Sequence, residues 1–411
     1  MRVHDAGKDR RRFLKNGVAG LAGMAVAPSV LGVQQKEPKE KPKKKSKFVT
    51  RKLGRTGLEL PVVNMGVMNS DNPSLVRAAL DAGILMLDTA HYYQRGRNEE
   101  MIGQVIKDRP RESYYIATKG LATARDRSSM QDAQRVEDEN DKSYMEKCEI
   151  SLKRLGLDYV DILYLHNVNS KEGAEREPIL KALEKLKKDG KIRFIGITTH
   201  SNEPEVIRAA VDLKIYDVVL TAYNFRQSGV KDVKKAIAEA AKAGLGVVAM
   251  KTQAGVYWDR DRTKPINMRA ALKWVLQDEN VHTAIPGFTT FDQMNLDVSV
   301  MEDLKLTPEE SKDLDLGDNL GVPGLYCPQC GNCIHQCRER LEVPDLMRAY
   351  MYAYGYRNLA CAREVLEGVE LGEDPCAGCY GCSVDCRMGF DIRGKVRDIA
   401  RLKTVPRDFL M

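Results

Sequence analysis

Eight of the ten cysteines in the 411-residue sequence lie in two short stretches, "CPQCGNCIHQC" and "CAGCYGCSVDC". Both stretches have the spacing Cys-x2-Cys-x2-Cys-x3-Cys, which places Cys327, Cys330, Cys333 and Cys337 in the first and Cys376, Cys379, Cys382 and Cys386 in the second. Three thiolates spaced by two residues can wrap one corner of a cubane, whereas a zinc site built from two paired knuckles does not require this pattern. The spacing therefore favours two [4Fe–4S] clusters. One cluster, zinc, or disulfides in an oxidising compartment remain as alternatives.

The spacing also resembles the cysteine run of bacterial ferredoxins, in which the fourth cysteine of one run ligates the other cluster. The proline that usually follows the fourth cysteine is replaced by Arg338 and Arg387. Between the two quartets, "DLMRAYMYAYGY" and "NLACAREVLEGV" have helical patterns. These features predict a small, mostly helical iron–sulfur (ferredoxin-like) domain over residues 319–400, followed by a C-terminal tail over 401–411.

A second set of reactive side chains follows three apolar runs earlier in the chain. Asp88 comes after "ILML", Lys119 after "YYIAT" and His166 after "DILYL", with Tyr93 five residues past Asp88. A carbonyl that accepts hydride needs a proton for its developing alkoxide, and a tyrosine with a pKa of about 10 is a poor donor near neutrality. We expect a buried Lys119 to lower the pKa of Tyr93, Asp88 to keep Lys119 charged, and His166 to polarise the carbonyl.

The elements that must position these residues alternate between short β-rich runs and helical patterns over residues 48–318. Eight strand candidates, from "VVNMGV" to "TAIPGF", are separated by helical stretches such as "PILKALEKLKKDG" and "VKKAIAEAAKAG". This pattern predicts an α/β fold, a (β/α)8 TIM barrel, whose C-terminal strand ends carry the chemistry. A doubly wound sheet is the alternative, but no Gly-x-Gly-x-x-Gly fingerprint follows the first strand.

Several ordered motifs resemble the aldo/keto reductase superfamily. They include "RKLGRTGLELPVVNMGVM", "LDTAHYYQRGRNEEMIG", "DILYLHN", "GKIRFIGIT" and "ALKWVLQDENVHTAIPGF". The resemblance implies a catalytic tetrad of Asp88, Tyr93, Lys119 and His166. It also implies an extended nicotinamide cofactor, NADP or NAD, held across the barrel mouth without a Rossmann domain.

The same resemblance assigns the cofactor contacts, with departures from the family's usual residues. Thr198 and Thr199 replace the usual Ser-Asn pair after the fifth strand. Gly287, Phe288 and Gln293 stand where NADPH-preferring members place Lys, Ser and Arg, so a charge-assisted phosphate clamp is missing there. The full set of implied contacts is Thr198, Thr199, Lys251, Gly287, Phe288, Thr289, Gln293 and Asp297.

The N-terminal segment differs in composition from the rest of the chain. Residues 1–47 hold thirteen Lys or Arg and four Asp or Glu, a net charge of +9; since the whole chain carries +7, the remainder carries −2. This distribution argues against a nucleic-acid partner.

The run Arg10-Arg11-Arg12-Phe13-Leu14-Lys15 and the mildly apolar stretch after it resemble a twin-arginine signal peptide over residues 1–32. A disordered basic tail is the alternative. Residues 33–47 read as a charged, flexible linker.

These features define three hypotheses. The first is an oxidoreductase that transfers hydride between NAD(P)H and an aldehyde, ketone or sugar-like alcohol, with clusters that are structural or that pass electrons to a partner. The second is an iron–sulfur electron-transfer protein that uses the barrel as a docking platform, and the third is a binding protein on a degenerate barrel. The intact tetrad favours the first. The signal predicts export by the twin-arginine translocase to a periplasmic or other extracytoplasmic location.

Overall fold

The structure is a computed structural model. It describes residues 48–122, 140–227, 229–253, 255, 265–315, 327, 331–372 and 374–410. The twin-arginine segment, the linker and Cys330 lie outside these residues. Among the residues that are described, no helix is long and apolar enough to cross a membrane.

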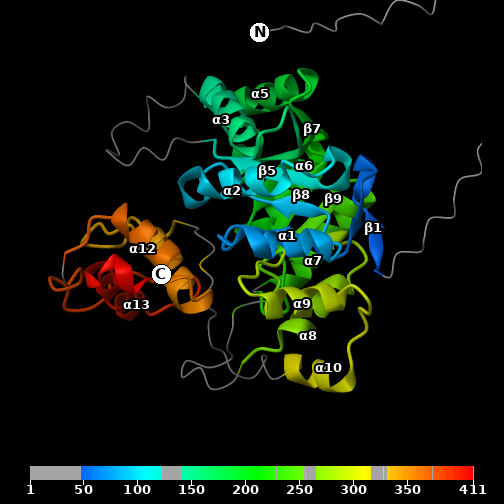
Figure 1. The fold of residues 1–411 in the computed structure, drawn as a ribbon. Coiled ribbons are helices and arrows are strands. Elements are labelled where there is room, and N and C mark those ends of the chain that lie inside the picture. The colour runs from blue at the N-terminus through cyan, green and yellow to red at the C-terminus, as the bar shows by residue number, and fades with distance from the viewer. Residues whose placement is uncertain are drawn as a thin grey trace, which may run out of the picture. The chain divides into compact units, whose positions relative to one another are not determined.

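Eight parallel strands close into a barrel, as the alternating pattern predicts (Figure 1). Each strand pairs with the next along the chain: β3 Met65–Gly66, β4 Met86–Asp88, β5 Tyr115–Gly120, β6 Val160–Leu165, β7 Ile192–Thr199, β8 Val218–Ala222, β9 Gly246–Met250 and β10 Thr283–Ala284. A parallel bridge from Val63 to Ala284 joins the last strand to the first. All six residues of β6 are buried, as expected for a parallel strand that is covered on both faces.

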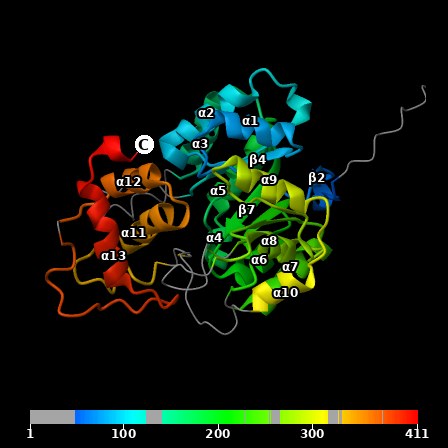
Figure 2. The ribbon, with the colours of Figure 1, turned by 60° about the horizontal axis from the view of Figure 1, so that its bottom comes forward.

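Helices surround this sheet, as Figures 1 and 2 show together. They are α1 Pro73–Asp81, α2 Arg97–Ile106, α3 Asn140–Leu155, α4 Lys171–Ala174, α5 Glu177–Lys188, α6 Glu203–Leu213, α7 Val230–Lys242, α8 Met268–Leu276, α9 Phe291–Val300 and α10 Pro308–Asp315. Helix α5 shows why they form and pack. Its buried residues Ile179, Ala182, Leu183 and Leu186 recur at helical spacing, so one apolar stripe faces the strands.

An antiparallel hairpin precedes the barrel. Its strands, β1 Thr50–Lys52 and β2 Glu59–Pro61, are joined through the 3-10 turn Gly54–Thr56. The Arg55 amide donates to Gly244 O at 2.7 Å, just before β9 begins. Leu53 and Leu60 pack with Met86, Ile162 and Val248 inside the barrel. The hairpin therefore covers the N-terminal end of the barrel and leaves the C-terminal strand ends for the site.

The described residues from 331 onward form a helical module with its own core. Its elements are α11 Val343–Tyr350, the π-helical turn Met351–Gly355, α12 Leu359–Glu367, α13 Ile392–Ala400, and the 3-10 turns Arg401–Thr404 and Arg407–Phe409. Leu346, Ala362, Leu366, Val396 and Ile399 are almost fully buried in that core. The barrel and this module belong to one compact unit. The predicted tail is attached to the module, because Arg363 Nη1 donates to Leu402 O at 2.6 Å.

Candidate active site

The four predicted catalytic residues meet at the C-terminal strand ends. Asp88 closes β4, Lys119 is the penultimate residue of β5, His166 follows β6, and Tyr93 opens a 3-10 turn, Tyr93–Gly96. Lys119 Nζ forms an ion pair with Asp88 Oδ1 and donates to the carbonyl oxygen of Thr89 at 2.6 Å. The same Nζ lies 5.2 Å from the centroid of the Tyr93 ring, and the Tyr93 and His166 ring centroids are 6.1 Å apart.

The ion pair is almost completely removed from solvent, with the side chains of Lys119 and Asp88 only 2% and 3% exposed. Burial raises the pKa of Asp88 and lowers the pKa of Lys119, and in each case the partner's charge acts against the shift. Asp88 Oδ2 is also buried, and no described residue donates a hydrogen bond to it. The site thus holds an acceptor that a ligand or a water molecule can satisfy.

Tyr93 differs from the expectation. Burial raises the pKa of Tyr93 well above its ordinary value, and Tyr92, Asp88, Tyr352 and Tyr356 raise it further. The predicted lowering by Lys119 is wrong for this arrangement. The main reason is burial of the phenol group, which the Lys119 ammonium, paired with Asp88 and facing the ring of Tyr93, does not offset. Tyr93 is therefore protonated near neutral pH, the state in which a general acid enters a reduction.

Tyr92 is a site residue that the sequence analysis missed. Its ring stacks on His166 at a centroid distance of 5.2 Å and meets Tyr93 edge to face at 5.3 Å. This contact fixes the plane of the imidazole at the rim of the barrel. The pair of adjacent tyrosines in "HYYQ" could have indicated this role. Of two neighbouring aromatic residues in a loop, one can pack against the site while the other takes part in the reaction.

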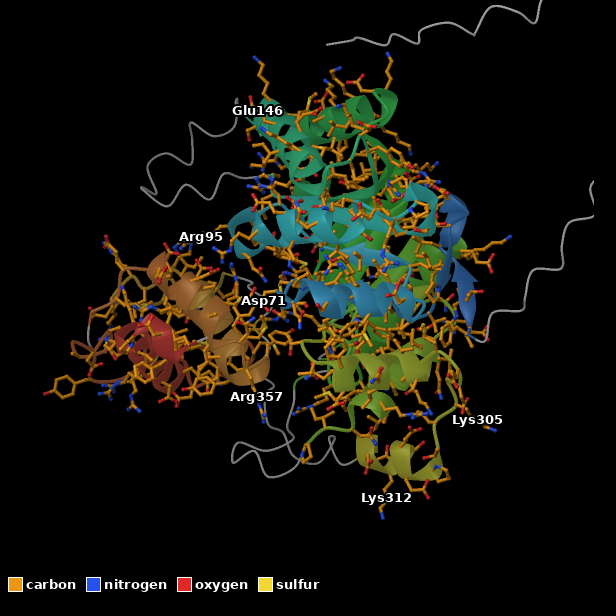
Figure 3. All side chains as sticks on the ribbon, viewed as in Figure 1. Asp71, Arg95, Glu146, Lys305, Lys312 and Arg357 are labelled. Carbon is orange, nitrogen blue, oxygen red and sulfur yellow. The ribbon has the colours of Figure 1, made fainter. Side chains whose placement is uncertain are left out.

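The turn that carries Tyr93 has an unusual backbone. Gln94 and Arg95 have φ values of 50° and 56°, and Gly96 has 93°, so three consecutive residues are left-handed. Such strain persists only where neighbouring groups enforce it. Gln94 Nε2 donates to Met68 O at 3.2 Å. Arg95, labelled in Figure 3, lies 3.8 Å from Glu367 of the C-terminal module.

Arg154 of α3 holds the other side of this loop. Its Nη1 donates to the carbonyl oxygen of His91 at 2.7 Å and pairs with Glu99 at 3.2 Å. A Cβ at Gly96 would collide with the Arg154 guanidinium, so only glycine allows this approach. Glu99 in turn accepts a 2.7 Å bond from Thr118 Oγ1, beside Lys119. Arg154 and Glu99 therefore link the Tyr93 loop to the strand that carries Lys119. No sequence motif indicated this role.

The residues that resemblance assigned to the cofactor also lie after C-terminal strand ends. Thr198 Oγ1 accepts from the Asn167 amide at 2.8 Å, and Thr199 Oγ1 donates to Ser201 O at 2.9 Å, so both hydroxyls already have partners. Lys251 follows β9 with a φ of 56°. Burial lowers the pKa of Lys251 to about 7.

The loop from β10 into α9 carries the remaining assigned residues. Gly287 and the buried Phe288 lead to Thr289, whose amide donates to Gln293 Oε1 at 2.8 Å. Asp297, one turn further along α9, is 1% exposed, and burial raises its pKa to about 7. No cation belongs to this group, which agrees with the missing phosphate clamp in the sequence.

Buried polar atoms test whether this end of the barrel fits a polar ligand. Four side chains in the loops after β3, β7, β8 and β9 have buried oxygens to which no described residue donates a hydrogen bond: Asn69 Oδ1, Ser201 Oγ, Gln227 Oε1 and Thr252 Oγ1. Such groups are costly unless a partner satisfies them. All four lie in loops at the catalytic end, where the two amide oxygens fit a carboxamide NH2 or hydroxyl donor and the two hydroxyls can donate to a phosphate.

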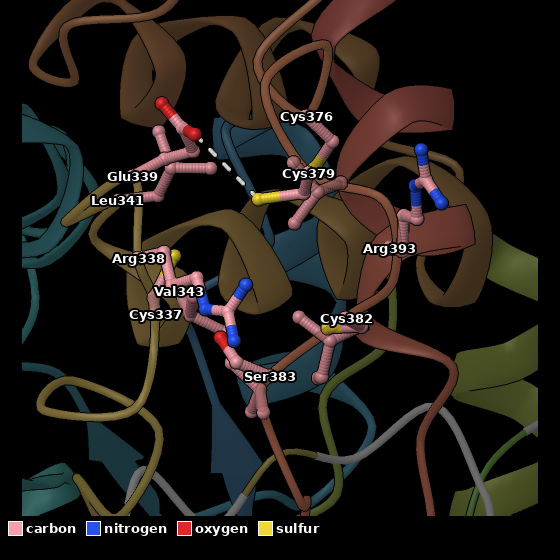
Figure 4. A pocket seen from close by; sticks show the side chains of 13 residues that line it. Cys337, Arg338, Glu339, Leu341, Val343, Cys376, Cys379, Cys382, Ser383 and Arg393 are labelled. Atoms are coloured by element: carbon pink, nitrogen blue, oxygen red, sulfur yellow. Dashed lines mark hydrogen bonds between the residues drawn. The ribbon is translucent and has the colours of Figure 1, made fainter.

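The second set of reactive residues surrounds a pocket in the C-terminal module. Cys376, Cys379 and Cys382 of the second run line it together with Cys337, the last cysteine of the first run (Figure 4). Burial raises the pKa of the Cys376 thiol, and the other three cysteines raise it further. These four thiols form no disulfide, and Cys379 Sγ lies 3.5 Å from Glu339 Oε1. Within the described part of the chain, no three His, Cys, Asp or Glu side chains gather as a site for a single metal ion.

Three further cysteines of the two quartets lie against the core of the module. Cys327 and Cys333 are partly buried and pack against the module core, as does Cys386. Cys330 lies outside the described residues. Cys337 of the first run thus lines the same pocket as three cysteines of the second run, while the predicted exchange of cluster ligands between the two runs stays a prediction.

Comparison with known proteins identifies the barrel. Residues 65–269 match the model of the aldo/keto reductase family. The chain is 32% identical over 171 residues to probable aldo-keto reductase 1 of Glycine max, covering 39% of this chain and 46% of the relative. It is 38% identical over 168 residues to L-galactose dehydrogenase of Arabidopsis thaliana, covering 37% and 49%. The chain thus spans about half the length of the curated relatives it matches.

Solved structures agree on the fold. An aldo-keto reductase from Bacillus halodurans superposes with a TM-score of 0.52 at 24% identity, covering 66% of this chain and 96% of that one. A thermostable aldo-keto reductase solved with the inhibitor epalrestat gives a TM-score of 0.50 at 25% identity, covering 66% and 99%. The chain carries an aldo/keto reductase family domain, and both the predicted barrel and the family resemblance are confirmed.

Proposed function

We propose that the protein is an oxidoreductase of the aldo/keto reductase type, transferring hydride between a nicotinamide cofactor and an aldehyde, ketone or sugar-like alcohol. The observation that carries this proposal is the convergence of Tyr93, the buried Lys119–Asp88 pair and His166 at one end of the barrel. The similarity to L-galactose dehydrogenase of Arabidopsis thaliana supports a sugar-like substrate. Thr198, Thr199, Lys251 and residues 287–297 would hold NADP or NAD.

The chain's own residues supply the proton and the charge stabilisation. When bound, a reduced nicotinamide supplies hydride to the carbonyl carbon, and the electron pair of the C=O bond moves to the oxygen. Tyr93 Oη gives that oxygen its proton and becomes a phenolate, which solvent later reprotonates. The Lys119 ammonium, oriented by Asp88, stabilises the phenolate as it forms, and His166 donates to the same oxygen. The reverse sequence oxidises an alcohol.

Tyr93→Phe tests this assignment. Nicotinamide affinity, measured by the quenching of protein fluorescence on titration, should change less than about threefold. Turnover should fall by at least about a hundredfold, because the hydroxyl acts only where charge develops. A Tyr93→Phe variant that keeps the turnover of the parent protein on a small aldehyde would refute the tetrad. Nicotinamide binding without any turnover by the parent protein would instead favour a degenerate barrel.

We further propose that the C-terminal module carries two [4Fe–4S] clusters. The pocket shared by Cys337, Cys376, Cys379 and Cys382 supports this proposal, because soft thiolates are the ligands that iron–sulfur clusters use. Anaerobically purified protein should contain about eight iron and eight acid-labile sulfide atoms per chain, the content of two such clusters. Stoichiometric zinc without sulfide would contradict the proposal. The clusters would be structural or would pass single electrons to a partner protein.

Export by the twin-arginine translocase completes the proposal. This route carries folded proteins, so clusters and nicotinamide can be inserted before transit to a periplasmic or other extracytoplasmic compartment. The support comes from the sequence of residues 10–15 alone.

A further inference from the structure

The C-terminal module is bonded to the barrel beside the catalytic turn. In α2, which begins directly after that turn, Arg97 pairs with Glu364 of α12. Arg95 Nη2, within the turn, approaches Glu364 O at 3.4 Å and Glu367 at 3.8 Å. The module therefore contacts the segment that positions Tyr93.

Two further bonds reach other loops at the same end of the barrel. Asn358 Nδ2 donates to the carbonyl oxygen of Asn69, in the loop after β3, at 3.3 Å. Arg387 Nη1 donates to Asn202 Oδ1, in the loop after β7, at 3.4 Å. The described bonds thus join the module to loops after three C-terminal strand ends, the end that carries the tetrad.

A π-helical turn at Met351–Gly355 sits at this contact. Single π turns often occur at functional sites, because they widen the backbone and redirect side chains. The Asn358 amide donates to Tyr352 O at 2.9 Å, and Asn358 Oδ1 accepts from the Cys361 amide at 2.9 Å. Since the Asn358 side chain also reaches Asn69, the turn is fixed to the barrel and to α12 at once.

Tyr352 lies within this turn and Tyr356 directly follows it, in the cluster of side chains against which Met68 of the loop after β3 packs. Their ring centroids are 6.2 Å apart, and both lie near enough to Tyr93 to influence its titration. The Asn69 side-chain amide donates to the phenolic oxygen of Tyr356, while Asn69 Oδ1 is buried and receives no hydrogen bond from any described residue. The two phenol rings and the unsatisfied amide oxygen therefore lie where the module is bonded to the loop after β3 and to the turn that begins at Tyr93.

The charges in this wall balance one another. Arg348, which lies near Tyr92 and Tyr352, pairs with Asp345 at 2.6 Å. A neutral wall of aromatic faces and hydroxyl groups suits a neutral ligand with its own hydroxyls. The ring faces of this wall can contact the C–H groups of such a ligand, and the polar atoms of the wall can exchange hydrogen bonds with the ligand's hydroxyl groups. An apolar aldehyde would leave those buried polar atoms unpaired, which costs binding.

We propose that Tyr352 and Tyr356 of the cysteine-rich module form a wall of the substrate pocket and select neutral, polyhydroxylated carbonyl compounds. This inference rests on the proposed function and specifies its substrate class. In this arrangement the module is part of the site, because the barrel alone lacks the two hydroxyl groups that distinguish a polyol-like substrate from a simple aldehyde.

The test compares two three-carbon aldehydes, glyceraldehyde and propanal, with the full-length, anaerobically purified protein. For Tyr352→Phe and Tyr356→Phe, kcat/KM for glyceraldehyde should fall about tenfold, and kcat/KM for propanal should change less than about threefold. Comparing each variant with the parent protein cancels the different intrinsic reactivities of the two aldehydes. Tyr354→Phe is the matched control, because Tyr354 packs on Tyr350 within the module at 4.3 Å and should alter neither rate.

Each result has one meaning. An equal loss of kcat/KM for both aldehydes, or unchanged kcat/KM in the Tyr352→Phe/Tyr356→Phe double variant, would contradict the assignment of Tyr352 and Tyr356 to the pocket wall. A parent protein that turns over propanal but not glyceraldehyde would overturn the substrate class. A parent protein that turns over neither aldehyde, while it binds nicotinamide, would refute the proposed function itself. Unchanged iron content and melting temperature in the variants exclude a loss of module structure.

Discussion

Replacing Asp88 with Asn should destabilise the barrel by about 3–5 kcal/mol near neutral pH, the usual cost of removing one partner of a buried ion pair. The remaining Lys119 ammonium is 2% exposed, and its one other described hydrogen bond goes to the carbonyl oxygen of Thr89. Because both side chains are almost fully buried, solvent screening offers little relief. Lys119→Met should cost a similar amount, since it leaves the Asp88 carboxyl buried without its cation.

The two variants should depend on pH in opposite directions. In Asp88→Asn, burial holds the pKa of Lys119 below its unfolded value of about 10.4. The unfolded chain therefore binds the extra proton between the two pKa values, and stability rises with pH by up to about 1.4 kcal/mol per unit. In Lys119→Met, burial holds the pKa of Asp88 above its unfolded value of about 3.9, so stability falls as pH rises between those two pKa values.

Urea unfolding of the parent protein, both single variants and the double variant at pH 6, 7.5 and 9 measures these effects. The double variant should be less destabilised than the sum of the single variants, because it leaves no lone buried charge. Costs below about 1 kcal/mol, or slopes of the same sign in both single variants, would show that Lys119 and Asp88 are not a buried pair. The reasoning about the tetrad would then lose its electrostatic basis.

Other substitutions probe the remaining parts of the site. Asp297→Asn should stabilise the protein at pH 8 but not at pH 4 in thermal unfolding. Burial raises the pKa of Asp297 to about 7, and the native state loses stability as pH rises through that value. An equal effect at both pH values would contradict this. Cys379→Ser should lower the iron content, and it should reduce turnover of glyceraldehyde more than of propanal; equal loss on both would assign the clusters a role in the reaction. Replacing Arg10 and Arg11 with Lys should retain the precursor in the cytoplasm on cell fractionation, and normal export would exclude the twin-arginine route.

The sequence predicted what depends on local pattern. Eight β-rich runs with helices between them specify the barrel, and Asp88, Lys119 and His166 each end or follow such a run, so parallel pairing brings them together. The spacing of the cysteines predicted that the two runs act together, and Cys337 does line one pocket with three cysteines of the second run; the clusters themselves stay a prediction. Each of these inferences needs only periodicity or spacing within one part of the chain.

The sequence could not predict contacts between distant segments. Tyr352 and Tyr356 lie in a run whose helical pattern suggests ordinary packing, and only the folded module shows that a π turn occurs there and that the module is bonded to the loops of the catalytic end. The role of Arg154 depends on a close approach to Gly96 that no motif encodes. The pKa of Tyr93 was misjudged because the sequence names a nearby lysine but does not show how deeply the phenol group is buried.

The raised pKa of Tyr93 bears on the protonation state that each half of the proposed reaction needs. Reduction requires a protonated Tyr93, and burial together with Asp88, Tyr92 and the two tyrosines of the module keeps it protonated across the neutral range. Oxidation of an alcohol requires the phenolate, which this environment disfavours. Lys119 can stabilise the phenolate only to the extent that Asp88 does not neutralise the positive charge of the Lys119 ammonium. In the proposed reduction, Tyr93 therefore begins in the protonated state that a general acid needs, and Tyr352 and Tyr356 of the module contribute to its raised pKa.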